Sequence, residues 1–279
     1  MQFPDIFMNL PVRNSRIKLS QGKLFWREVG KGPTLVFLHG AWHDGNQWLP
    51  VIDSLSGKYH CLAPDLLGFG ESDRPDVHYS IHLEVECLAE YLETLNLKKI
   101  YLVGDGVGGW IAASYALRYP EKVGGLVLLA PEGVQVDGAR RNLWWLRWLL
   151  DRPKVVDWLW HWLPILKKRK FPGWLSKIKD LLPRLEQILE SPAACQLLFQ
   201  RRKSEIEAEL LEEKLPWLKK PVLILQGEQD SSTAVALNKA YAQMLPNAQV
   251  KILPNGESAL SQQLPEEVAN YIHEFVLRH

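Results

Sequence analysis

Four runs of apolar residues most constrain how this chain can fold. They read TLVFL at 34–38, IYLV at 100–103, GLVLLA at 125–130 and PVLILQ at 221–226. None alternates between polar and apolar side chains, which is typical of strands buried on both faces of a parallel sheet. Helical patterns at 48–55, 81–95, 107–118 and 265–277 separate or follow them, and shorter strand signals occur at 16–19, 23–29, 59–63 and 248–254. The repeated order predicts an α/β fold with a doubly wound sheet.

The alternation stops in the middle of the chain. From Gly138 to about Leu215 the sequence has no strand signal, only amphipathic helical sequence interrupted by five prolines. The strand pattern returns at Pro221. We therefore expect a core domain at 1–131 and 219–279, with an all-helical cap at 132–218.

The stretch LVGDGVGGW at 102–110 places a glycine-rich turn between a strand and a helix. Together with LVFLHGAWHDGNQW at 35–48, DLLGFGESDRP at 65–75, VLILQGEQD at 222–230 and LPNGESALSQQLPEEV at 253–268, it resembles the α/β-hydrolase superfamily, in the group of esterases, epoxide hydrolases, haloalkane dehalogenases and C–C bond hydrolases. The resemblance implies a mostly parallel sheet of about eight strands flanked by helices. It covers almost the whole chain outside the insertion.

The same resemblance locates the positions of a catalytic triad. Gly106 stands at the nucleophile position, Asp230 at the acid position and Glu257 at the histidine position. Glycine has no oxygen or sulfur to deprotonate, and a carboxylate does not replace an imidazole as the base of an acyl-enzyme cycle. The leading expectation is therefore a catalytically degenerate member, a pseudoenzyme.

The glycine-rich turn at 104–108, the elbow, retains its backbone N–H groups even without a nucleophilic side chain. Glycine adopts the strained backbone of this turn at no cost, and the amides of Ala41 and Val107 are the implied oxyanion hole. The alternative function is an active hydrolase of an ester or similar bond with a rearranged site, drawing on Asp105, Asp230, Glu257 or His43. His273 is a further replacement base, and Glu132 a displaced acid without an evident task.

The cap has an unusual composition. Between 140 and 179, eleven basic residues stand against two aspartates, a formal charge of +9, and seven of the chain's 12 tryptophans occur there. Such a segment suits a helix lying at an anionic membrane surface, a docking surface for a protein partner, or an aromatic lid over a small apolar ligand. The residues expected to bind are Trp144, Trp145, Trp148, Trp158, Trp160, Trp162, Lys167, Lys168, Arg169 and Lys170.

The overall composition argues against several further classes of function. With 33 Lys and Arg against 32 Asp and Glu, the net charge of +1 argues against nucleic-acid binding. Three cysteines without ligand spacing predict buried, reduced thiols and no metal site, and no cofactor motif occurs. Without a secretory or membrane-spanning pattern, we expect a cytoplasmic protein, or one bound peripherally to a membrane.

Overall fold

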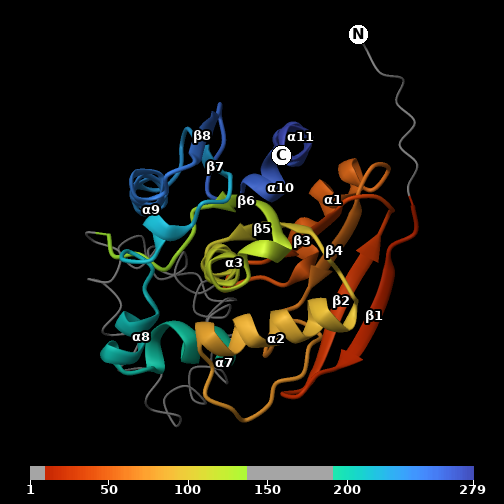
Figure 1. Ribbon diagram of the computed structural model, residues 1–279, viewed down its shortest axis with the longest axis vertical. Coiled ribbons are helices and arrows are strands. Elements are labelled where there is room, and N and C mark those ends of the chain that lie inside the picture. The colour runs from red at the N-terminus through yellow and green to blue at the C-terminus, as the bar shows by residue number, and fades with distance from the viewer. Residues whose placement is uncertain (1–9, 137–190) are drawn as a thin grey trace, which may run out of the picture.

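A computed structural model of the chain describes residues 10–136 and 191–279, which contain an eight-stranded sheet flanked by helices (Figure 1). The spatial order is β1-β2-β4-β3-β5-β6-β7-β8. β2 pairs antiparallel with both of its neighbours, and all other neighbouring strands pair in parallel. The strands are β1 (Arg13–Lys18), β2 (Lys23–Val29), β3 (Thr34–Leu38), β4 (His60–Pro64), β5 (Ile100–Asp105), β6 (Val123–Leu129), β7 (Val222–Gly227) and β8 (Ala248–Leu253).

Helices cover both faces of the sheet, as the apolar runs predict. One apolar cluster joins one sheet face to α2 (Ile81–Thr94), α3 (Val107–Arg118) and α9 (Ser232–Met244). The other joins the opposite face to α1 (Leu49–Leu55) and α11 (Pro265–Arg278). The short helices η1 (Gly45–Trp48), η2 (Pro120–Lys122) and α10 (Leu260–Gln263) lie in the connections.

The predicted elements mostly occur where the sequence patterns place them. β2, β3 and α3 have the predicted bounds, and α2 and α11 differ by one residue at one end. β1 begins earlier than predicted because its polar first residues pair with β2, Arg13 opposite Glu28. α9 was not predicted from the sequence; it is rich in alanine and contributes few large side chains to the core.

A buried carboxylate fixes the loops at the carboxyl end of the central strands. Asp65, which is fully buried, accepts hydrogen bonds from Arg27 Nη1 at 2.6 Å and from the backbone N–H groups of Gly45 at 2.7 Å and Glu71 at 2.8 Å. These groups belong to β2, to η1 and to the loop before α2. The ion pair and its backbone donors therefore hold two loops that border the candidate site.

The described part of the cap, 191–218, is helical and contains no strand. It comprises α7 (Pro192–Cys195), a π-helical turn at Gln196–Gln200, α8 (Lys203–Glu209) and η5 (Leu215–Trp217). At its neck, Leu211 N–H donates to the Gly133 carbonyl at 2.9 Å and Gln135 N–H donates to Glu212 at 2.6 Å. The bounds 132–218 stay a prediction, and the tryptophan-rich, basic stretch lies outside the described residues.

Candidate functional site

The turn between β5 and α3 has a backbone conformation that glycine alone adopts easily. Gly106 has φ +52° and ψ −114°. Its N–H donates to the Leu129 carbonyl at 3.0 Å, and its carbonyl accepts from the N–H groups of Glu132 at 3.0 Å and Trp110 at 3.1 Å. These bonds hold the turn against the end of β6. The elbow implied by the resemblance is thus present, with glycine at its tip.

The space beside Gly106 is open. A Cβ built at Gly106 would find Glu132 Oε1 at 3.7 Å and Gly40 Cα at 4.0 Å as its nearest neighbours. At Gly108, by contrast, a Cβ would lie 2.2 Å from the Leu38 carbonyl oxygen, so that glycine is required by close packing. A side chain at position 106 would therefore project toward a carboxylate.

Two backbone amides border this space. Ala41 is buried in the loop after β3, and Val107 is the first residue of α3. Within the described ranges, neither N–H has a hydrogen-bond acceptor. The preceding Gly40 N–H donates to Gln47 Oε1 at 3.1 Å, which fixes the loop that contains Ala41. The role of these two amides as oxyanion-hole donors stays a prediction.

Glu132 follows β6 and is half-buried. Its carbonyl accepts a hydrogen bond from the Tyr241 hydroxyl at 2.5 Å, which ties it to α9. Its N–H is bonded to the elbow as described above, so both backbone groups are fixed. This residue had no evident task in the sequence, because only the folded chain brings its carboxylate next to position 106.

Asp105 belongs to a buried polar chain behind the elbow. Gln47 Nε2 donates to Asp105 Oδ2 and also lies 3.4 Å from Ser261 Oγ in α10. Desolvation is the main cause that raises the pKa of Asp105 to about 6; the hydrogen bond from Gln47 opposes this shift, and the nearby charge of Asp230 adds to it. Gln47 and Ser261 were missed from the sequence, since isolated polar residues carry no spacing signal.

The other two predicted triad positions do not form a pair with each other. Asp230 Oδ2 accepts from Gly227 N–H at 2.7 Å, and burial raises its pKa. Glu257 is exposed and shares hydrogen bonds with Gln263: its N–H donates to Oε1 at 3.1 Å, and its Oε2 accepts from Nε2 at 3.3 Å. Glu257 therefore has an interaction partner in the helix that follows its loop, α10.

The two histidines considered as replacement bases lie in different places. His43 follows the oxyanion loop and lines a cavity, and desolvation lowers its pKa, so its ring is neutral at pH 7. His273 in α11 contacts the Tyr59 hydroxyl at 2.6 Å and lines none of the cavities at the elbow. Of the two, His43 alone borders the candidate site.

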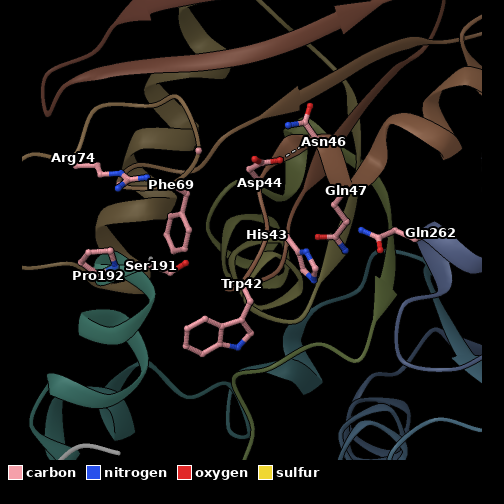
Figure 2. Close-up of a pocket in the computed structure, with 12 residues that line it drawn as sticks. Trp42, His43, Asp44, Asn46, Gln47, Phe69, Arg74, Ser191, Pro192 and Gln262 are labelled. Carbon is pink, nitrogen blue, oxygen red and sulfur yellow. Dashed lines mark hydrogen bonds between the residues drawn. The ribbon is translucent and has the colours of Figure 1, made fainter. Parts of the chain in front are cut away.

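Two cavities lie near the elbow, and Trp42 lines both of them. The first, of about 810 Å³, has mainly polar walls that include His43, Asn46, Arg74 and Gln262 (Figure 2). The second, of about 330 Å³, is mainly apolar, and Glu132 is the one carboxylate among its described lining residues. Such a pair of spaces suits a small molecule with unlike ends.

No helix among the described residues is long and apolar enough to cross a bilayer. Nor do the described histidines, cysteines and carboxylates form a cluster that could hold a metal ion. Cys61, Cys87 and Cys195 are buried thiols, as predicted.

The comparisons with known proteins agree with this geometry. The family model described as alpha/beta hydrolase fold matches residues 33–172. A 2-hydroxy-6-oxo-2,4-heptadienoate hydrolase of Pseudomonas putida is 36% identical over 117 residues, which are 39% of this chain and 41% of that protein. A monoacylglycerol lipase of Homo sapiens is 26% identical over 263 residues, 88% of this chain and 76% of that protein.

Among solved structures, a putative lipase of Acinetobacter baumannii superposes with a TM-score of 0.74 at 24% identity and covers 96% of this chain and 91% of that one. This likeness concerns the fold. The matches to the first curated relatives span 33% of those proteins' own length.

Proposed function

Because the chain belongs to the alpha/beta hydrolase fold family, we propose that it hydrolyses an ester or similar bond with a rearranged site. The proposal depends on one observation: a carboxylate oxygen of Glu132 lies 3.7 Å from where the side chain of a nucleophile at position 106 would begin. The related proteins named as a hydrolase and a lipase are consistent with this assignment. It replaces the expectation of an inactive protein as the leading function.

In this proposal, water takes the place of the missing side chain. Glu132 removes a proton from a water molecule held beside Gly106 while the water oxygen bonds to the substrate carbonyl carbon. The N–H groups of Ala41 and Val107 stabilise the oxyanion that forms. When the intermediate collapses, the leaving alkoxide takes the proton back from Glu132, which yields acid and alcohol without an acyl-enzyme.

The test uses a series of chromogenic esters with the purified protein and Glu132→Gln. General-base catalysis contributes about 10²–10⁴-fold, so we expect kcat/KM to fall at least about 100-fold in the variant. Glu121→Gln, at an exposed glutamate in η2, is the matched control. A single turnover in ¹⁸O-water should place the label in the acid, with no covalent adduct by mass spectrometry. Equal activity of wild type and Glu132→Gln would refute the role of Glu132.

A second candidate is a binding protein without turnover, the pseudoenzyme of the sequence analysis. One observation favours it: the histidine position holds Glu257, which is exposed and bonded to Gln263. The imidazole base of a triad is therefore missing at this position. In that case no ester is turned over, yet a carbonyl ligand still quenches tryptophan fluorescence at the Trp42 cavities. A Gly106→Ser, Glu257→His double variant that gains esterase activity would support this candidate.

A further inference from the structure

Trp42 forms the boundary between the two cavities. Its ring stacks on Phe199 of the cap, with centroids 6.1 Å apart and planes inclined by 20°. The elbow lies at the same boundary: the open position at Gly106 faces Glu132 of the apolar cavity, and Gly40 lies beside His43 of the polar cavity. A carbonyl group bound at the elbow would therefore have one substituent in the polar cavity and the other in the apolar cavity.

The apolar cavity suits the apolar part of such a ligand. Trp110 and Leu237 of the core form one wall, and Leu197 and Ile206 of the cap form the other. Its volume of about 330 Å³ is at the small end of the range for ligand sites. A short or medium apolar chain would bury its surface there.

The polar cavity contains an uncompensated cation. Arg74 lies in its wall, is exposed, and has no carboxylate partner within 10–136 and 191–279. Asp44, the carboxylate of the same cavity, accepts a hydrogen bond from Asn46 N–H at 2.8 Å and caps η1. In Figure 2, Arg74 and Asp44 are drawn on opposite sides of Phe69.

We propose that the ligand is an ester of an apolar acid whose alcohol part carries an anionic group, and that Arg74 selects this group. The proposal rests on the proposed function only for the position of the ester bond. The guanidinium supplies two parallel N–H donors to a phosphate or carboxylate. Neutral donors on Asn46, His43 and Gln262 also line the cavity, and Asp44 is the one carboxylate among its described lining residues.

The test measures binding, not turnover. The probes are two ether analogues that contain no carboxylic ester bond, 1-O-octylglycerol 3-phosphate and 1-O-octylglycerol, titrated below their micelle concentrations by calorimetry. Because hydrogen bonds to charged groups are the stronger ones, we expect the phosphate to bind about tenfold more tightly. Arg74→Gln should abolish this difference and leave the binding of the neutral analogue unchanged.

Two variants complete the design. Asp44→Asn keeps a favourable helix cap and should make the phosphate analogue bind modestly more tightly, because it removes the negative charge that Asp44 contributes to the cavity. Arg278→Gln, at an exposed arginine of α11, is the matched control and should change nothing. The proposal is overturned if wild type binds both analogues equally, or if Arg74→Gln weakens both. A failure of ester turnover alone would refute the proposed function and leave this preference standing.

Discussion

Gly106 combines a strained backbone with an open side-chain position. At φ +52° and ψ −114° any residue with a Cβ pays a conformational cost, yet the nearest atom to that Cβ is 3.7 Å away. Packing therefore does not demand glycine here, while the backbone favours it. At Gly106, glycine therefore relieves backbone strain, while the space for a side chain stays open.

Gly106→Ala separates these two effects. We expect it to lower the free energy of unfolding by about 1–3 kcal/mol, from backbone strain alone, and to reduce ester turnover because its methyl group displaces the proposed water. Urea unfolding and kcat/KM measure the two. Gly57→Ala is the control, since nothing lies within 4 Å of its Cβ. If Gly106→Ala leaves turnover intact, water does not occupy this position.

Asp105 makes stability depend on pH. Its pKa in the folded protein, about 6, lies above the ordinary 3.8, so the folded state binds this proton more tightly than the unfolded state does. The ionisation of Asp105 therefore lowers the free energy of unfolding as the pH rises from about 4 to about 6. Asp105→Asn should raise the unfolding free energy at pH 7 by up to about 3 kcal/mol and leave it unchanged at pH 4.

Denaturant unfolding at the two pH values checks this prediction, with exposed Asp53→Asn as control. Asparagine can still accept the hydrogen bond from Gln47 Nε2, so loss of that contact does not confuse the comparison. A variant less stable than wild type at pH 7 would show that the charged carboxylate, not the neutral acid, supports the fold.

At the scale of elements, Glu209 attaches the cap to the core. Its carboxylate accepts from the buried Arg201 at 2.5 Å and from the N–H groups of Ile81 at 3.3 Å and His82 at 3.0 Å, at the start of α2. Its carbonyl accepts from Trp110 Nε1 at 3.2 Å. One residue at the end of α8 thus connects α2, α3 and the turn that includes Arg201.

Glu209→Ala leaves Arg201 buried without its carboxylate, and removing one partner of such a pair costs about 3–5 kcal/mol. We expect a loss of that size in thermal or urea unfolding. Glu207→Ala, whose pair with Lys203 is exposed, should change stability by less than about 0.5 kcal/mol. Similar losses in both variants would show that the attachment is not specific to Glu209.

Features that depend on neighbouring residues in the chain can be predicted from the sequence, whereas contacts between residues far apart in the chain cannot. The buried strands and α3 are set by local apolar runs and turn residues, so their bounds are predictable. The juxtaposition of Glu132 with position 106 depends on β5 and β6 pairing in register, Asp105 opposite Leu129. Gln47 and Ser261 meet across 214 positions of chain, and no local pattern records that contact.

At the scale of the molecule, the near-neutral net charge hides a basic segment. Its +9 between 140 and 179 is balanced by acidic residues elsewhere. We predict that the protein co-sediments with anionic vesicles at low salt, and that replacing Lys167, Lys168, Arg169 and Lys170 together by glutamine weakens this at least tenfold, since each basic residue contributes about 1 kcal/mol. A Lys98→Gln, Lys99→Gln variant is the control; equal sedimentation with neutral vesicles would contradict the prediction.

The hydrogen bonds at the neck of the cap have a consequence for how such a chain changes over generations. Because Leu211 is bonded to Gly133, everything between them forms one loop whose two ends already meet. Doubling such a loop costs the sheet only about 0.6 kcal/mol of closure entropy. Insertions within this segment therefore cost the fold little closure entropy, and descendants can lengthen the cap while keeping the eight strands, provided that contacts such as those of Glu209 are kept.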